Sequence, residues 1–456
     1  MVTTPRSSGV RTFLLIWFGQ LVSVLGTGIT RFALLLWAYQ QTIAAGQPAT
    51  TVALLGFCAY IPYLLCSPLA GVVVDRVDRR RVMLCADVGA GALTLGLWAC
   101  YTLGDLRLWQ LYVAEALTGA CEAFQVPAYT AATSLLVAKA SYGRVNGLRA
   151  LAEAASQVLA PVLAGILLPW IALPGILLLD VTTVCVACLT LLTVRIPPPP
   201  GALDDGPTAE GWWPQVSYGF RYIRRSPGLW GLLGIYVGMN GCAALTYFSI
   251  LPAMVLARSG NNARALATVQ MALGLGGVVG GLLASVWRGP QRRIHTVLLG
   301  AACSFFLGDV LFATGREVRV WSLAALSGAF FIPLIMSANR AIWQTHVPPA
   351  VQGRVFAVQS MLQQLSMPLG YLVAGPLADG VFEPAMQPGR TLSALLGGLV
   401  GTGPGAGMAV MFLGTALLGT MMSLSGYLVR AVRCVEDEAA ADETAEDEAA
   451  AGVVCQ

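Results

Sequence analysis

The sequence predicts an all-α membrane protein with twelve transmembrane helices in two pseudo-symmetric six-helix halves. Of the 456 residues, 56% are hydrophobic and 11% are charged, whereas a soluble chain carries about 25% charged residues. Apolar stretches of about 18 residues or more are typical of membrane-spanning helices. We expect spans at 12–38, 52–74, 82–104, 109–134, 146–168, 172–194, 229–256, 266–287, 294–314, 320–345, 356–378 and 407–430.

One long polar connection divides the chain. Residues 196–228 open with four prolines, which cannot continue a helix, and Trp212–Arg225 can form a short amphipathic helix at the membrane surface. We expect an N-terminal half at 1–195, a cytoplasmic linker at 196–228 and a C-terminal half at 229–430. Residues 431–456, which hold eight acidic residues, are expected to form a disordered cytoplasmic tail.

Short sequence matches relate the two halves. Three features recur 210 residues further along the chain in the same order: Gly71 at Gly281, Gly143-Arg144-Val145 at Gly353-Arg354-Val355, and Ala164-Gly165 at Ala374-Gly375. A parallel repeat of six helices is a known plan of secondary transporters.

Basic residues indicate which connections face the cytoplasm. An even number of spans places both termini on one side, and if that side is the cytoplasm, cytoplasmic segments hold 20 of the 27 Lys and Arg residues. We therefore expect a multi-pass protein of the cell membrane, inner or plasma, with both termini cytoplasmic.

A dense charged knot separates the spans 52–74 and 82–104. Gly71 in this stretch, GVVVDRVDRRRVM, would let two helices approach closely. Asp75 at the helix end would face the positive N-terminus of a helix from the other half, a contact that contributes about 0.3–1 kcal/mol. A contact of that size suits a conformational latch, which must both hold and release.

The arginines of the knot have two interpretations. Arg76, Arg79 and Arg80 can pair with acids such as Asp87 or lie on anionic headgroups as part of the latch. The alternative is that they only mark the cytoplasmic side. In the second half, Ser285 stands at the position that matches Asp75, so any latch is one-sided.

The knot resembles the signature loop of the major facilitator superfamily, although Asp78 stands where that family usually has Gly. The runs FQVPAYTAATSLLV, AIWQTHVPPAVQGRVFAVQSM and YLVAGPLADGVFEP are similar to the macrolide-efflux-like branch of drug and metabolite exporters. The resemblance implies the major facilitator fold, alternating access and, in many members, proton antiport. It also implies that the helix starting near Arg354 is the partner of Asp75.

Charged residues within spans are candidates for function because a charge in the bilayer core costs at least ~2.5–3.5 kcal/mol. Glu122 lies near the middle of the span 109–134, where a carboxyl group can load and release a proton or contact a cationic substrate. A structural ion pair with Arg31 of the first span is the alternative.

Five further charged residues are weaker candidates for function. Asp180 and Asp309 could carry protons, although packing roles are expected because their helices are peripheral in the implied fold. Glu115 is expected to be solvated at the outer end of its span. Arg149 and Glu153 are expected to pair locally, since they are one helical turn apart.

The span 146–168 contains a candidate hinge. Pro161 bends a helix and frees a backbone carbonyl, and Gly165 permits close packing. The resemblance places helices one, four, seven and ten around the centre, which gives candidate substrate-cavity residues Trp37, Phe124, Gln125, Tyr236, Asn240, Tyr247 and Asn339. Such a mostly apolar site suits a bulky amphiphile.

We therefore expect an exporter of a drug-like or secondary-metabolite molecule, coupled to protons and surrounded by lipids. Alternatives are nutrient uptake, lysolipid or siderophore transport, and a membrane sensor that does not transport. An enzyme is not expected, because the chain has only two His residues and no phosphate-binding loop. The sequence gives no indication of a cofactor, a metal or nucleic acid, and a monomer is expected.

Overall fold

The twelve predicted spans are present in the structure, a computed structural model that describes residues 6–137, 142–194, 212–287, 290, 292–348 and 351–436. Within these ranges the secondary structure is helical, with no strand. Ten described helices are long and apolar enough to cross a membrane. α5 (Tyr142–Thr193) holds two spans, because its backbone breaks at Ala172, with φ 48°. α4 (Leu108–Leu136) provides the remaining span.

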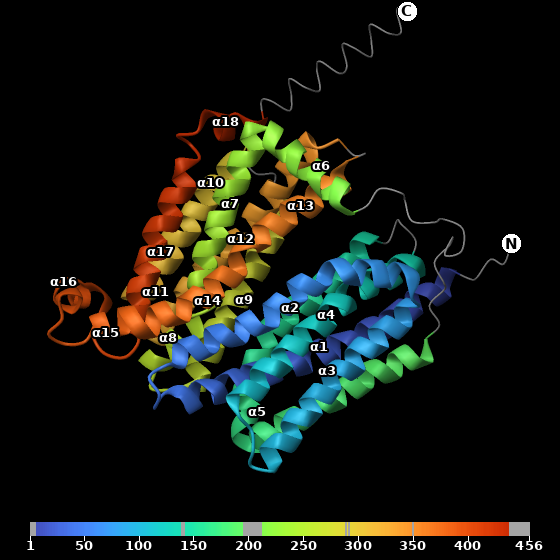
Figure 1. Ribbon diagram of the computed structural model, residues 1–456, viewed down its shortest axis with the longest axis horizontal. Helices are drawn as coiled ribbons and strands as arrows, with labels where there is room; N and C mark the ends of the chain where they lie inside the picture. The colour runs from blue at the N-terminus through green and yellow to red at the C-terminus, as the bar shows by residue number, and fades with distance from the viewer. Residues whose placement is uncertain are drawn as a thin grey trace, which may run out of the picture. The chain divides into compact units, whose positions relative to one another are not determined.

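The chain separates into two compact units. Unit 1 comprises Met1–Gly206 and Val255–Met271. Its helices are α1 (Arg6–Thr42), α2 (Pro48–Arg76), α3 (Arg79–Thr102), α4 and α5. α1 packs along α5, α2 packs along α4, and α3 contacts both α4 and α5 (Figure 1). The first, third and sixth spans therefore meet inside this unit.

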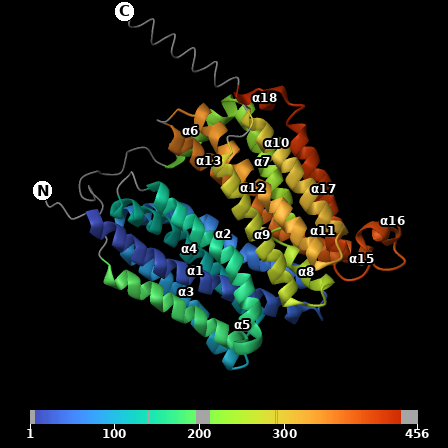
Figure 2. The same cartoon turned by 180° about the vertical axis from the view of Figure 1, so that it is seen from behind.

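Unit 2 comprises Pro207–Met254 and Ala272–Gln456. Its elements, with two that are shared with unit 1, are α6 (Trp212–Arg225), α7 (Pro227–Leu245), α8 (Leu251–Arg258), α9 (Ala263–Val286), α10 (Arg293–Cys303), the π-helix η2 (Ser304–Asp309), α11 (Val310–Thr314), α12 (Val318–His346), α13 (Gln352–Gln364), α14 (Ser366–Leu377), η3 (Ala378–Phe382), α15 (Glu383–Ala385), α16 (Thr391–Val400), α17 (Ala406–Ser425) and α18 (Arg430–Arg433). The short helix α16 was not predicted. α6 stands where the amphipathic helix is expected (Figure 2).

The internal repeat is visible in the burial of matched residues. Ala164 and Ala374 are both fully buried, and Val145 and Val355 are 4% and 0% exposed. These four positions follow the 210-residue offset found in the sequence. Equivalent helices therefore turn equivalent faces to the interior of their own unit.

Glycines permit two very close helix contacts, one in each unit. A Cβ atom on Gly119 of α4 would lie 2.0 Å from the backbone oxygen of Ala59 in α2. One on Gly280 of α9 would lie 2.0 Å from the backbone oxygen of Phe330 in α12. A Cβ on Gly71 would meet no described atom within 4 Å, so the close approach there stays a prediction.

The start of the C-terminal segment is ordered, so the prediction of disorder from residue 431 is wrong for 431–436. Val432 and Val435 are fully buried in the core of unit 2. The carboxylate of Glu436 accepts hydrogen bonds from the backbone N–H groups of Arg293 and Ile294, both at 3.1 Å. This segment therefore caps the N-terminus of α10. Residues 437–456 lie outside the described residues.

Candidate functional site

A cluster of one guanidinium and two carboxylates lies inside unit 1. Arg31 projects from α1, and Glu115 and Glu122 lie two turns apart on α4. Arg31 Nη2 is 2.7 Å from Glu122 Oε1, and Arg31 Nε is 3.5 Å from Glu115 Oε2. The ion pair that was one alternative for Glu122 is therefore present, and the three groups have a formal charge of −1.

The two carboxylates of this cluster differ in accessibility. The side chain of Glu115 is 14% exposed, whereas those of Glu122 and Arg31 are 39% and 38% exposed. The prediction that Glu115 is solvated is wrong, because it packs against the guanidinium. Glu122 is the more accessible group for a proton or a substrate.

A second buried carboxylate lies close to the cluster along α1. Asp180 of α5 is 2% exposed. Thr27, one turn before Arg31, donates to its Oδ1 at 3.1 Å, and Thr94 of α3 donates to its Oδ2 at 2.8 Å. Both carboxylate oxygens have donors, so Asp180 joins the first, third and sixth spans.

The predicted cavity residue Gln125 belongs to a polar network around Asp87. Gln125 Nε2 lies 2.6 Å from Asp87 Oδ1, and Gln20 Nε2 donates to Asp87 Oδ2 at 3.0 Å. Gln125 Nε2 is also 2.8 Å from Gln20 Oε1. The proposed pairing of Asp87 with Arg80 is wrong, because the two glutamine amides satisfy this carboxylate.

The described part of the charged knot packs locally. Arg80 donates to the backbone oxygens of Leu191 and Leu192, at 2.7 and 2.6 Å. Asp78 caps α3 by accepting from the N–H of Arg80 at 2.9 Å. Two guanidinium nitrogens of Arg79 are buried without a hydrogen-bond partner among the described residues. The side chains of Asp75 and Arg76 lie outside the described residues.

Asp309 ends the π-helix η2 in unit 2 and is fully buried. Thr415 Oγ1 of α17 lies 2.6 Å from Asp309 Oδ2. The same hydroxyl is 3.1 Å from the backbone oxygen of Phe412 and 3.3 Å from that of Met411, so its one hydrogen has three possible acceptors. The cavity candidate Tyr247 packs edge-on against Phe312 and Phe412 in this region. Both Asp309 and Tyr247 are thus enclosed by packing.

The remaining predicted positions are distributed over both units. Phe124 packs on the core of unit 1, and Tyr236 packs on the core of unit 2. Asn240 Nδ2 donates to the backbone oxygen of Gln363 at 3.2 Å. Asn339 is 5% exposed, and Trp37 on α1 is partly buried.

The hinge candidate Pro161 lies within a continuous part of α5. The one residue of that helix with non-helical backbone angles is Ala172. A Cβ on Gly165 would meet Ala267 at an ordinary 3.5 Å. The break in the backbone at Ala172 therefore marks the turn between two spans, and the hinge at Pro161 and Gly165 stays a prediction.

Arg149 also differs from its expected pairing. Its guanidinium lies 4.8 Å above the ring of Tyr129, and Nη1 donates to the hydroxyl of Thr130 at 3.0 Å. Both partners are on α4, so Arg149 joins α5 to α4 instead of pairing with Glu153 along its own helix. The described ion pairs contain no Arg149–Glu153 contact.

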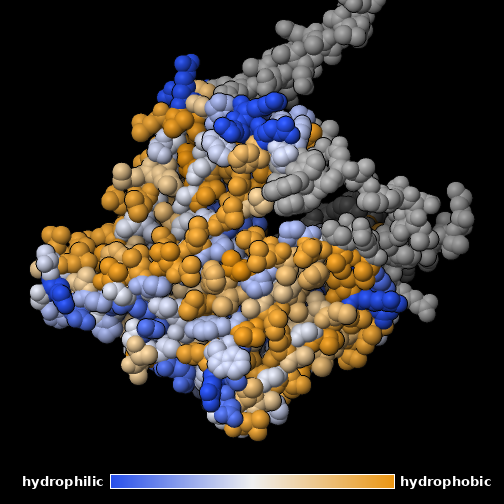
Figure 3. Space-filling view, in the orientation of Figure 1, coloured by the Kyte–Doolittle hydropathy of each residue, from blue (hydrophilic) through white to orange (hydrophobic). Residues whose placement is uncertain are grey.

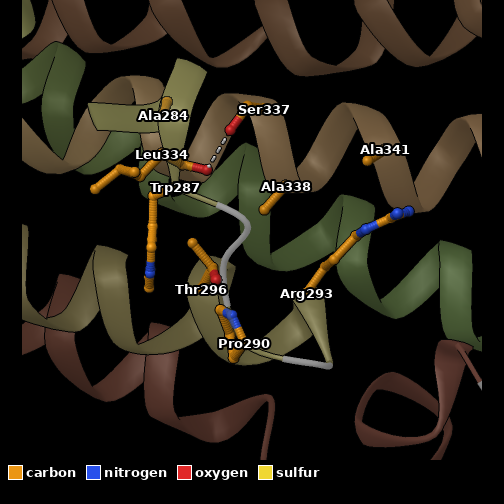
Figure 4. A pocket seen from close by; sticks show the side chains of 9 residues that line it. All are labelled: Ala284, Trp287, Pro290, Arg293, Thr296, Leu334, Ser337, Ala338 and Ala341. Carbon is orange, nitrogen blue, oxygen red and sulfur yellow. Dashed lines mark hydrogen bonds between the residues drawn. The ribbon is translucent and has the colours of Figure 1, made fainter. Parts of the chain in front are cut away.

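A small pocket lies within unit 2, between the end of α9, the start of α10 and the second half of α12. Trp287, Arg293 and Ser337 are among its lining residues (Figure 4). Ser337 donates to the backbone oxygen of Leu334 at 3.0 Å. None of the predicted cavity residues lines it. Among the described residues no group of three His, Cys, Asp or Glu side chains is arranged to hold a metal ion.

Two curated proteins similar to this chain are efflux proteins by name. Macrolide efflux protein A of Streptococcus pyogenes is 26% identical over 387 residues, which cover 81% of this chain and 90% of that protein. Multidrug efflux pump Tap of Mycolicibacterium fortuitum is 26% identical over 401 residues, covering 85% and 94%.

Solved structures share the fold at lower identity. A bacterial homolog of the human lysosomal transporter Spinster matches with a TM-score of 0.64 and 15% identity, covering 96% of this chain and 99% of that one. The nucleoside transporter NupG matches with a TM-score of 0.64 and 11% identity, covering 91% and 98%. The family model described as Major Facilitator Superfamily matches residues 16–371, and the chain belongs to that superfamily as a multi-pass membrane protein.

Proposed function

We propose that this chain is a secondary active transporter that exports a drug-like or secondary-metabolite molecule by proton antiport. The names of its curated relatives, macrolide and multidrug efflux proteins, support the direction and the substrate class. The Arg31–Glu122 ion pair is the observation that carries the coupling mechanism. The transporter works as a monomer in the cell membrane with both termini in the cytoplasm.

The proposed mechanism is competition for Glu122. The ion pair with Arg31 is more than one-third exposed, and exposed pairs contribute only about 0–1 kcal/mol, so it can open within a transport cycle. Protonation of Glu122 neutralises its carboxylate, and Arg31 keeps Glu115 as a partner at 3.5 Å. A substrate that binds near the deprotonated Glu122 then excludes the proton, as antiport requires.

The charged knot is proposed to act as a one-sided latch through Asp75, Arg76 and Arg79. The buried guanidinium nitrogens of Arg79 support this, because such groups need an anionic or carbonyl partner. Arg80 has a different role, since it caps the end of the sixth span through the carbonyl groups of Leu191 and Leu192.

Transport into inverted membrane vesicles tests the proposal. An imposed proton gradient is applied with a panel of labelled macrolides and other amphiphilic antibiotics. The wild type is compared with Glu122→Gln and Asp75→Asn, and Glu317→Gln serves as the matched control because it removes an exposed acid outside the cluster.

We expect gradient-dependent uptake in the wild type and in Glu317→Gln. In Glu122→Gln the rate of this uptake should fall at least about tenfold while the compound still binds. In enzymes, proton transfer by one positioned side chain contributes at least ~100-fold to the rate. Unchanged uptake in Glu122→Gln would reject the coupling role of Glu122. No gradient-dependent flux of any compound would reject the export function as stated.

A further inference from the structure

The helix α6 is fixed to unit 2 by one of its faces. Ile223 is fully buried in the core of unit 2, in the same cluster as Leu229 of α7 and Val432 of α18. The hydroxyl of Tyr222 donates to the backbone oxygen of His346 at the end of α12, at 2.9 Å. α6 and α18 therefore lie at the same end of this unit, beyond its spans (Figure 1).

The opposite face of α6 is basic and exposed. Arg221, Arg224 and Arg225 are all exposed, and their spacing of three and four residues places them on one side of a helix. Arg221 Nε donates to the backbone oxygen of Ser217 within α6. Arg224 and Arg225 have no ion-pair partner among the residues that the structure describes.

Exposed apolar and basic side chains lie at the same end of unit 2. Phe220 of α6 packs edge-on against Trp230 of α7, with ring centroids 5.6 Å apart, and the two are 37% and 43% exposed. Leu428 is 88% exposed and precedes the exposed Arg430 and Arg433. Hydrophilic residues gather at this end of unit 2 next to hydrophobic ones (Figure 3).

We propose that the basic face of α6, together with Arg430 and Arg433, binds the phosphate headgroups of anionic phospholipids. Guanidinium groups form bidentate hydrogen bonds with phosphate. Aromatic side chains such as Trp230 favour the headgroup level of a bilayer. Because α6 is fixed to the core through Ile223 and Tyr222, its arginines are held in place before the lipid binds. This site goes beyond the proposed export function and does not depend on it.

The C-terminal residues 437–456 are the competing occupant, since they contain seven acidic residues. Lipid is favoured because Phe220, which precedes Arg221, and Leu428, which precedes Arg430, are exposed, and an acidic, alanine-rich peptide offers these apolar side chains no acyl chain to contact. Truncation of the chain after Glu436 separates the two occupants.

Lipid binding to the purified full-length protein in detergent tests the proposal. Native mass spectrometry measures the affinity for short-chain phosphatidylglycerol and for phosphatidylcholine. The variant R224Q/R225Q leaves the contact of Arg221 intact. The control R319Q/R390Q removes two exposed arginines at the starts of α12 and α16, and α12 begins at the end opposite to His346.

Each arginine next to an anionic headgroup changes the affinity by about fivefold, so R224Q/R225Q should weaken phosphatidylglycerol binding by about 25-fold. R319Q/R390Q should change it by less than about twofold, and phosphatidylcholine binding should be unaffected. Equal weakening by both double variants, or no weakening by R224Q/R225Q, would overturn the proposal. A tenfold or larger rise in affinity after truncation at Glu436 would assign the face to the tail and would overturn it too.

Discussion

The two units have the same helical plan but hold their polar groups differently. In unit 1, the Arg31–Glu115–Glu122 cluster and the Asp87 network join helices through charged and amide side chains. In unit 2, the fully buried acid is Asp309, and the hydroxyl of Thr415 contacts its carboxylate. The ion chemistry proposed for Glu122 therefore concerns unit 1.

The buried acids Asp180 and Asp309 show the same divergence within the repeat. In unit 1 the acid lies on the sixth span and its threonine partner Thr94 on the third. In unit 2 the acid lies on the ninth span and its partner Thr415 on the twelfth. The hydrogen bond between corresponding helices is retained while donor and acceptor have exchanged places, so the repeat conserves contacts rather than residues.

The largest expected effect on stability concerns the close glycine contacts, where the units should behave alike. Gly119→Ala and Gly280→Ala should each destabilise the protein by about 1–3 kcal/mol or more, because a Cβ would lie 2.0 Å from a backbone oxygen. Denaturant unfolding in detergent measures the free energy of unfolding.

Gly281→Ala, one residue further on the same helix, is the control. A Cβ there meets nothing within 4 Å, so it should be neutral or slightly stabilising. Equal losses for Gly280→Ala and Gly281→Ala would contradict the packing.

Much of the fold could be predicted because apolar length and turn residues are local signals. The spans and α6 follow from stretches of about 14–28 residues, and the repeat follows from a constant offset. Glu115 and Asp87 could not be placed, since their partners are far away in the chain: Arg31 for the first, and Gln20 and Gln125 for the second. The rule that a charge within a span needs a partner suggested the Arg31–Glu122 pair, but it does not say which amide or second acid joins such a contact.

The C-terminal cap shows the same limit. Asp78 caps α3 from a neighbouring position in the sequence, which a pattern can reveal. Glu436 caps α10 across more than 140 residues of chain. The acidic composition of the tail predicted solvation, and only the structure shows that its first acidic residue binds a helix N-terminus.

The second largest expected loss of stability concerns the polar network around Asp87 in unit 1. Asp87→Ala removes the acceptor for Gln20 and Gln125, and unsatisfied buried polar groups cost about 1–3 kcal/mol. The free energy of unfolding in detergent should fall by that amount. Asp105→Ala removes an exposed acid and should change it by less than about 0.5 kcal/mol. A neutral Asp87→Ala would show that unit 1 does not depend on this network.

The smallest expected effect is on the remote cap of unit 2. Glu436→Ala should lower the free energy of unfolding by about 0.5–2 kcal/mol, because two backbone N–H groups at the start of α10 lose their acceptor. Hydrogen exchange should increase at Arg293 and Ile294. Exchange that stays as slow as in the wild type would mean that the carboxylate does not protect them.

The pH dependence of substrate binding tests the central assignment most directly. Affinity for a transported compound is measured at equilibrium between about pH 4 and pH 8, for wild type, Glu122→Gln and Glu317→Gln. If a proton and the substrate compete for Glu122, wild type and Glu317→Gln should bind more weakly as the pH falls, while Glu122→Gln should bind equally at each pH. A Glu122→Gln variant that keeps the wild-type pH dependence would contradict this account.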